Sequence, residues 1–428
     1  MNILRRLLTR VPSLPTLASF GAIQAAQMVL PLLALPYLSR VLGPGPFGTT
    51  LYMLTVSALS AMCVEWGFAL GAVRQVAVLR DDPPALARVV GGILSAKCLL
   101  AAACVLLAVA GGLLLPPARE HPWGYALAVA NGVALGFSPL WFHQGMGTGV
   151  VRVAACEVGG GVAVLLLMLP LVRQPEHWAR YLLLLLLARA GAYVWLTAGV
   201  FRQLGLCPGG LRLDDGWRAL CATRHLFLAH LGAMAKTHGA PLLLGGVLPA
   251  RDMGMLIACD KMARGLVSLT MPVTLTLFPE LCAARSRGCG GSLLRRTLAW
   301  AAVVMSVGAV AVWWLAPWLV TLALGREYAE AAMLLRWLCP LLVLLPLNCV
   351  LGTLGLVPQG RERVLTLAIG VAAVAGLAVS IPLARMFGAV AGAWLSAGME
   401  GIICVILFVA MHRVDPELLR APFRRSRP

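Results

Sequence analysis

The stretch LGAMAKTHGAPLLLGGVLPARDMGMLIACDKMARGLVSLTMPVTLTLFP, residues 231–279, decides the fold. It contains two apolar runs long enough to be membrane helices, and both carry charges near their middles. The first run holds Lys236, and the second holds Asp260, Lys261 and Arg264. A charge at the centre of a membrane helix costs about 2.5–3.5 kcal/mol on insertion scales. We therefore expect these side chains to face a polar cavity between helices rather than lipid.

The composition of the whole chain is that of a membrane protein. Of its 428 residues, 60% are hydrophobic and 12% are charged, with a mean hydropathy of +0.87. The net charge is +18, but the basic residues are spaced between apolar runs without interleaved aromatics, which argues against nucleic-acid binding. The 12 cysteines form no C-x-x-C pair and lie mostly in apolar segments. We expect no disulfides, no bound metal and no cofactor.

A membrane helix needs roughly 20 mostly apolar residues. By this rule the sequence predicts an all-α polytopic membrane protein with about twelve transmembrane helices. These are residues 17–39, 47–70, 89–115, 123–144, 153–172, 179–201, 224–248, 253–281, 297–320, 329–351, 364–386 and 388–411. The segments between the spans do not exceed roughly 25 residues, which leaves no room for a soluble catalytic domain. The chain is therefore expected not to be an enzyme.

Arginine is distributed unevenly between the two sides of this predicted topology. With both termini on one side, that side receives 22 arginines and the opposite side receives 7. Because Lys and Arg are enriched in cytoplasmic loops, both termini are expected in the cytoplasm.

The sequence also indicates an internal repeat. Val41-Leu42-Gly43, between the first two spans, corresponds to Val247-Leu248-Pro249, between the seventh and eighth spans, at an offset of 206 residues. Pro139 and Pro346 match at a similar offset of 207 residues. We expect two six-helix bundles, residues 1–206 and 207–428, the second ending in a short basic cytoplasmic tail. An even number of spans in each half gives a pseudo-twofold axis along the membrane normal, as in transporters with parallel repeats.

Several short motifs resemble one family of bacterial transporters. They are PYLSRVLGPGPFG (residues 36–48), EWGFALGAVRQVAVLRDD (65–82), PLWFHQGM (139–146), PVTLTLFPEL (272–281) and ALGREYAEAAMLLRWL (323–338). In this order and spacing, they are similar to the polysaccharide-repeat-unit (O-antigen or exopolysaccharide) flippases of the multidrug/oligosaccharidyl-lipid/polysaccharide exporter superfamily. The sequence departs from the family pattern at Phe142-His143-Gln144, where a second aromatic is expected in place of the histidine.

The resemblance implies a transporter in the bacterial inner membrane that uses alternating access. Its substrate would be a polyprenyl-pyrophosphate-linked oligosaccharide, flipped from the cytoplasmic to the periplasmic leaflet for cell-surface polysaccharide assembly. Its expected partners are this lipid-linked glycan and the membrane lipids, and candidate protein partners are a polysaccharide polymerase and chain-length proteins. Coupling to a proton or sodium gradient is an open possibility.

An anionic pyrophosphate requires cations inside the membrane, and six basic residues lie within the predicted spans. The candidate substrate-binding residues are Lys97, Arg189, Lys236, Lys261, Arg264 and Arg336, and the candidate coupling residues are Glu65, Asp260 and Glu400. Glu157 is a fourth acid within a span.

Several of these residues also have a structural alternative. Asp260 and Arg264 are four residues apart on a helix, and this spacing favours an ion pair. Lys97 and Arg336 could instead extend along the bilayer to its surface. Arg189 and Lys236 have no acid within four residues on their own helix, so we expect them to be unpaired and available to substrate.

Two other functions compete with this interpretation. A cation-coupled multidrug antiporter of the same superfamily would be expected to have a net acidic cavity, but the predicted spans contain six bases and four acids. A membrane-embedded glycosyltransferase or polymerase would need a carboxylate in a sizeable external loop, whereas the predicted outer loops are short.

The predicted topology can be tested with reporter fusions. A fusion after Arg202 and a fusion at the C-terminus should both give the cytoplasmic signal, and a fusion after Arg326 should give the periplasmic signal. Paired alkaline phosphatase and fluorescent protein reporters at each point measure this. A reversed signal at any of the three points would contradict the twelve-span arrangement.

Overall fold

The computed structural model describes residues 14–205, 212–270, 277, 281 and 290–414. Over this part of the chain the secondary structure is helical, without a β-strand. The chain folds into two compact units, residues 1–230 and 231–428. The boundary predicted at residues 206/207 falls outside the described residues and stays a prediction.

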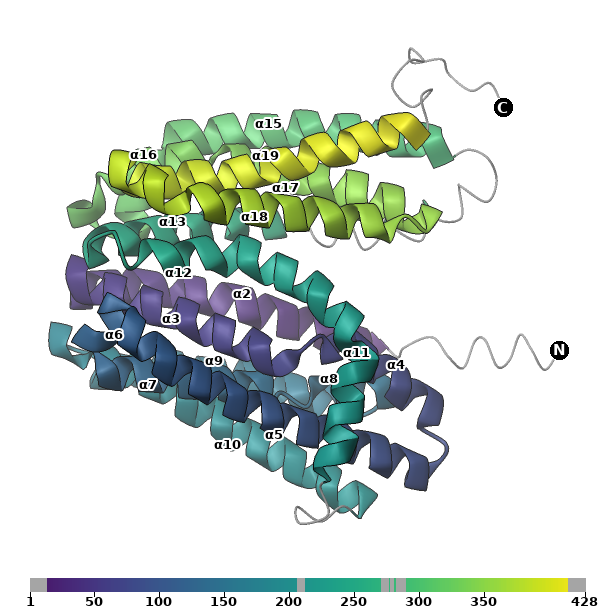
Figure 1. Cartoon of the computed structure of the whole chain (residues 1–428). Helices are drawn as coiled ribbons and strands as arrows, with labels where there is room; N and C mark the ends of the chain where they lie inside the picture. Colours follow the sequence, from purple (N-terminus) through teal and green to yellow (C-terminus); the bar gives the residue numbers. More distant parts are fainter. Residues whose placement is uncertain (1–13, 206–211, 271–276, 278–280, 282–289, 415–428) are drawn as a thin grey trace. The chain divides into compact units, whose positions relative to one another are not determined.

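Unit 1 contains the helices up to the first part of α11 (Figure 1). They are α2 (Leu14–Leu42), α3 (Pro44–Glu65), α4 (Phe68–Leu79), α5 (Pro83–Leu114), α6 (Pro116–Glu120), α7 (Pro122–Gly136), α8 (Leu140–Met146), α9 (Val150–Leu171), α10 (Trp178–Leu204) and α11 (Leu213–Met234).

Unit 2 begins within α11 and contains two segments of π-helix. Its elements are the π-helix η3 (Ala235–Gly239), α12 (Ala240–Leu244), α13 (Ala250–Ser268), α15 (Gly290–Ala323), α16 (Ala331–Leu338), α17 (Pro340–Asn348), the π-helix η5 (Cys349–Leu356), α18 (Glu362–Phe387) and α19 (Ala389–Val414).

Ten helical segments of the described chain are long and apolar enough to cross a membrane. They are Gly21–Leu42, Pro44–Glu65, Pro83–Leu114, Pro122–Met146, Val150–Leu171, Pro175–Leu204, Leu293–Ala323, Ala331–Gln359, Glu362–Phe387 and Ala389–Arg413. The other two predicted spans, 224–248 and 253–281, hold Lys236, Asp260, Lys261 and Arg264, and the second lies partly outside the described residues. The number twelve therefore stays a prediction.

The outer face of α15 shows how such a span meets lipid. Trp300, Val307, Trp314 and Trp318 are all exposed on it. Exposed apolar side chains along a whole helix are unfavourable in water and are expected in a bilayer.

In unit 1, α7 packs closely against α3 because of two glycines. A Cβ atom on Gly132 would lie 2.3 Å from the Ser57 carbonyl oxygen, and one on Gly136 would lie 2.5 Å from Val64 Cβ. Small residues four apart let membrane helices approach at backbone distance. The Ser57 hydroxyl accordingly donates to the Ala128 carbonyl oxygen at 2.6 Å. This contact places polar groups of two helices side by side in the interior of unit 1.

The internal repeat is visible in the helix boundaries. In unit 1, α3 begins at Pro44, and in unit 2, α13 begins at Ala250, 206 residues later. This is the offset predicted from the turn motifs. Lys236 and Asp260 thus belong to the first two helices of the second repeat, which correspond to α2 and α3 in the first.

Candidate functional site

A buried ion pair joins two helices of unit 2. The Lys236 ammonium lies 2.6 Å from Glu400 Oε1. The Lys236 side chain is 14% exposed and the Glu400 side chain 2% exposed. Lys236 lies in the π-helix η3, where one extra residue per turn changes the direction of the side chains, and such segments often mark functional sites. Glu400 lies near the middle of α19.

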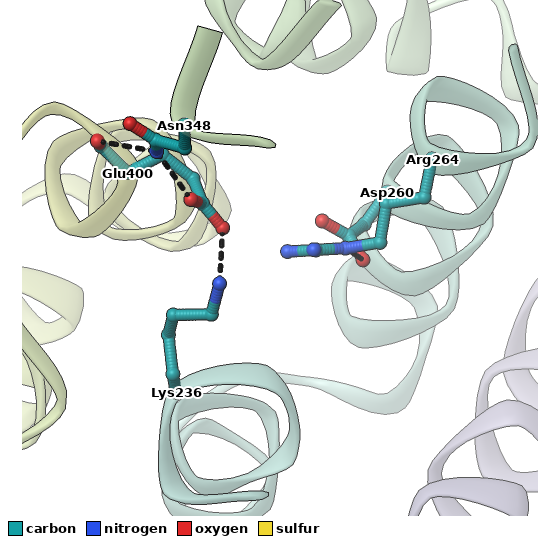
Figure 2. A network of polar contacts seen from close by, with 5 residues as sticks. All are labelled: Lys236, Asp260, Arg264, Asn348 and Glu400. Atoms are coloured by element: carbon teal, nitrogen blue, oxygen red, sulfur yellow. Dashed lines mark hydrogen bonds and ion pairs between the residues drawn. The ribbon is translucent and has the colours of Figure 1, made fainter. Parts of the chain in front are cut away.

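Asn348, the last residue of α17, holds the second oxygen of the same carboxylate (Figure 2). Its Nδ2 atom donates to Glu400 Oε2 at 2.9 Å and to the Glu400 carbonyl oxygen at 3.0 Å. The two carboxylate oxygens therefore have different partners. Oε1 faces the ammonium, and Oε2 faces a neutral amide.

A second ion pair lies beside the first, on α13. Arg264 Nε donates to Asp260 Oδ2 at 2.8 Å, one helical turn away. This confirms the pair predicted from the spacing of four residues. Figure 2 shows the guanidinium extending from α13 toward the Lys236–Glu400 pair, and Arg264 attracts Glu400 electrostatically.

Two acceptor atoms in this group have no donor among the described residues. They are Asp260 Oδ1 and Asn348 Oδ1, and both are buried. Buried polar atoms in proteins are nearly always hydrogen-bonded. We call Lys236, Asp260, Arg264, Asn348 and Glu400 the charge cluster of unit 2. It contains two cations, two anions and two acceptors that lack a donor.

The expectation that Lys236 is unpaired is wrong. It has no acid nearby on its own helix, but Glu400 reaches it from a helix 164 residues later in the chain. A rule limited to spacing on one helix cannot find such a pair. Removing Lys236 alone would leave the Glu400 carboxylate buried without its cation, which typically costs about 3–5 kcal/mol.

Unit 1 contains a separate chain of polar contacts around Arg189 on α10. Arg189 Nη1 donates to Asn131 Oδ1 at 2.9 Å, and Asn131 Nδ2 donates to the Ser57 hydroxyl at 3.1 Å. The Tyr193 hydroxyl, one turn from Arg189, donates to Glu157 Oε1. Arg189 is therefore bound to a neutral amide, and no carboxylate neutralises it in the described contacts.

Lys97 does not reach the membrane surface. Its side chain is 1% exposed, its Nζ donates to the Gly136 carbonyl oxygen at 2.6 Å, and the ammonium lies 5.8 Å from the centre of the Trp141 ring. The alternative in which Lys97 extends to the surface is wrong. Glu65, at the end of α3, attracts it electrostatically. The geometry is that of a tie between helices, and a substrate-binding role for Lys97 stays a prediction.

Arg336 on α16 lies against an aromatic residue. Its Nε donates to the Trp313 carbonyl oxygen at 3.2 Å, and the guanidinium carbon is 4.7 Å from the Trp313 ring centre. These contacts join Arg336 to α15, the helix that carries Trp313. Its substrate-binding role stays a prediction, as do the coupling roles of Glu65, Asp260 and Glu400.

The sequence analysis missed the two asparagines that hold these charged groups. The chain has three asparagines, and two of them, Asn131 and Asn348, lie within apolar spans. A primary amide in hydrocarbon requires partners, and this signal could have identified both. His238 on η3 also lies within electrostatic range of Lys261, Arg264 and Asp260.

Comparison with known proteins identifies the family to which the chain belongs. A family described as "Polysaccharide biosynthesis protein" matches residues 17–282. A protein of Escherichia coli (strain K12) named "Putative O-antigen transporter" is 21% identical over 401 residues, which cover 92% of this chain and 96% of that protein. A Shigella dysenteriae protein of the same name is 23% identical over 383 residues, covering 86% of this chain and 92% of that one.

Two solved structures share the fold. The lipid II flippase MurJ, in an inward closed conformation, matches with a TM-score of 0.69 at 9% identity, covering 93% of this chain and 87% of that chain. An inward-facing multidrug resistance MATE family transporter of the MOP superfamily matches with a TM-score of 0.62 at 13% identity, covering 94% and 99%. These matches confirm the all-α polytopic fold.

The Asp260–Arg264 pair can be tested by single and double substitution. Asp260→Ala and Arg264→Ala should each lower the amount of folded protein, because each leaves one charge buried and unpaired, at a cost of about 3–5 kcal/mol. The double variant should recover much of that loss, because both desolvation costs disappear together. Fluorescence-detected size-exclusion chromatography in mild detergent measures folded protein for all three.

Asp252→Ala is the control, since Asp252 lies on the same helix α13, in its first turn and away from the pair. It should leave the amount of folded protein near that of the unsubstituted chain. A double variant as depleted as the worse single variant would show that the two side chains do not act as a pair.

Proposed function

This chain belongs to the polysaccharide biosynthesis protein family, and from that premise we propose that it flips a polyprenyl-pyrophosphate-linked oligosaccharide across the bacterial inner membrane. The glycan starts at the cytoplasmic leaflet and ends at the periplasmic leaflet, and the two units alternate access to either side. The observation that carries the proposal is the set of cations held inside membrane helices of both units by polar partners.

The chemistry of such a substrate fits these cations. A pyrophosphate carries several negative charges close together and loses its hydration on entering a membrane protein. Arginine and lysine replace that hydration with charge-assisted hydrogen bonds. Lys236 and Arg264 supply these groups in unit 2, and Arg189 supplies them in unit 1.

Arg189 is the best-placed cation of unit 1. A guanidinium has five N–H donors in a planar fork that suits phosphate oxygens. One donor is directed to the neutral Asn131, which orients the group without cancelling its charge. Tyr193 and Glu157 lie nearby. The Tyr193 hydroxyl can donate hydrogen bonds to sugar hydroxyls and accept them, and the Glu157 carboxylate can accept them.

The balance of charges argues against a multidrug antiporter that binds cations. In unit 2 the Asp260 and Glu400 carboxylates are each already bound to a cation of the chain. In unit 1 the described cations are bound to a carbonyl oxygen and to an amide oxygen. A cationic drug would therefore meet cations that no carboxylate of these contacts neutralises, and they would repel it.

The remaining parts of the proposal rest on the family premise and, for the termini, on the uneven distribution of arginine. The transporter is not an enzyme, it has both termini in the cytoplasm, and it operates beside a polysaccharide polymerase and chain-length proteins. Transport is coupled to a proton or sodium gradient through Glu65, Asp260 or Glu400. A relative named "Putative O-antigen transporter" that covers nearly the whole chain supports this assignment.

Reconstitution of the purified protein in lipid vesicles tests the function. Wild-type protein should speed the movement of a fluorescent polyprenyl-pyrophosphate-linked oligosaccharide between leaflets, measured by quenching with an impermeant reductant. Arg189→Gln should slow it by roughly tenfold to a hundredfold, because a hydrogen bond to a charged group contributes about 1.5–3 kcal/mol. Arg189→Lys should keep part of the rate, because the charge remains.

The matched control is Arg363→Gln, an exposed arginine at the start of α18, which should transport at the wild-type rate. All variants should be reconstituted at equal amounts of folded protein. Vesicles with wild-type protein that flip the lipid no faster than protein-free vesicles would refute the proposed function.

A further inference from the structure

We propose that Glu400 is an internal occupant of the anion site in unit 2. Its carboxylate holds the Lys236 ammonium when no substrate is bound, and a phosphate group of the substrate displaces it. The released Glu400 oxygen then pairs with Arg264. This inference rests on the proposed function, because it assigns Lys236 to the pyrophosphate of the substrate.

The occupant solves a physical problem of an empty anion site. A site for pyrophosphate needs cations inside the membrane, but an ammonium without a counter-ion is strongly unfavourable there. The Glu400 carboxylate is an oxyanion like phosphate, and its Oε1 atom lies 2.6 Å from Lys236 Nζ. The Lys236–Glu400 pair is therefore neutral in the absence of substrate, and no anion from solution is needed to balance the ammonium.

The Glu400 carboxylate can leave Lys236 without losing all of its hydrogen bonds. Only Oε1 faces Lys236, while Oε2 is held by Asn348 Nδ2 at 2.9 Å. Asn348 also holds the Glu400 carbonyl oxygen, so α17 and α19 stay joined when the ammonium leaves. Asn348 is a positioning residue in this scheme, because it stays bonded to Oε2 in both states.

Arg264 is the second cation available to Glu400. Its guanidinium points toward the Lys236–Glu400 pair (Figure 2), and it attracts Glu400 electrostatically while its Nε remains on Asp260. Once Oε1 leaves Lys236, the terminal amino groups of Arg264 can take it. Glu400 thus moves from Lys236 to Arg264 while Asp260 keeps its bond to Arg264 Nε, and the ligand takes the position that opens on Lys236.

Two acceptors without donors indicate that the ligand brings hydroxyl groups. Asp260 Oδ1 and Asn348 Oδ1 are buried beside the two ion pairs, with no donor among the described residues. An unprotonated phosphate group supplies no donor to them, whereas a sugar attached to the phosphate supplies O–H donors. The chemical class that fits is a glycosyl phosphate, with its phosphate on Lys236 and hydroxyls on these two oxygens.

The test measures binding of inorganic pyrophosphate to the purified full-length chain by isothermal titration calorimetry. Glu400→Gln removes the competing charge and should bind pyrophosphate at least about tenfold more tightly than wild type. Glu400→Asp keeps the charge but shortens the side chain by one methylene, so its hold on Lys236 weakens. It should bind with an affinity between those of wild type and Glu400→Gln. Lys236→Gln should lose binding.

Glu400→Asp separates displacement from a general electrostatic effect, because both carboxylates carry the same charge. It also serves if Glu400→Gln does not fold. Glu362→Gln, an exposed acid at the start of α18, is the control and should bind like wild type. Glu400→Asp and Glu400→Gln that bind no more tightly than wild type, or a chain that binds no pyrophosphate in any form, would overturn the inference.

These outcomes are distinct from failure of the proposed function. A chain that flips the lipid-linked oligosaccharide but shows wild-type affinity in both Glu400 variants overturns displacement alone. A chain whose affinities follow the predicted order but that does not move the lipid overturns flipping alone.

Discussion

A charge inside a membrane helix needs a partner from within the protein, and both units are built around this constraint. In water such a partner is optional, because solvent stabilises the charge. In hydrocarbon an unpaired charge is costly enough to outweigh the packing of a helix. Lys236 meets the constraint with Glu400, Arg264 with Asp260, Arg189 with Asn131, and Lys97 with the Gly136 carbonyl oxygen. Three of these four contacts join different helices, so the cations also fix which helices pack together.

The same constraint underlies the anion binding that we propose for the charge cluster of unit 2. A single buried ion pair has one favourable way to pair its charges. Two neighbouring ion pairs have a second, because a carboxylate of one pair can bind the cation of the other. The position of Arg264 beside the Lys236–Glu400 pair provides that second arrangement. Asn348 keeps Glu400 attached to α17 throughout. A transporter that alternates between states needs elements with two stable arrangements, and the proposed displacement of Glu400 would make this cluster such an element.

The fold class, the spans in sequence order and the internal repeat could be predicted because they depend on local composition and periodicity. The Asp260–Arg264 pair could also be predicted, because it lies within one turn of one helix. The Lys236–Glu400 pair could not, since its members are 164 residues apart and meet only through packing. The π-helices η3 and η5 carry no sequence signal that we could recognise. Lys236 lies within η3, and η5 begins directly after Asn348.

The most direct test of the account is a structure of the chain with a bound polyprenyl-pyrophosphate-linked sugar, determined by electron cryo-microscopy in lipid nanodiscs. The decisive measurement is the distance between Lys236 Nζ and Glu400 Oε1, which is 2.6 Å here. Displacement of Glu400 by substrate predicts that this distance grows beyond hydrogen-bonding range, with a phosphate oxygen on Lys236 and Glu400 on Arg264. A bound substrate whose phosphates lie elsewhere while the Lys236–Glu400 pair stays intact would contradict it.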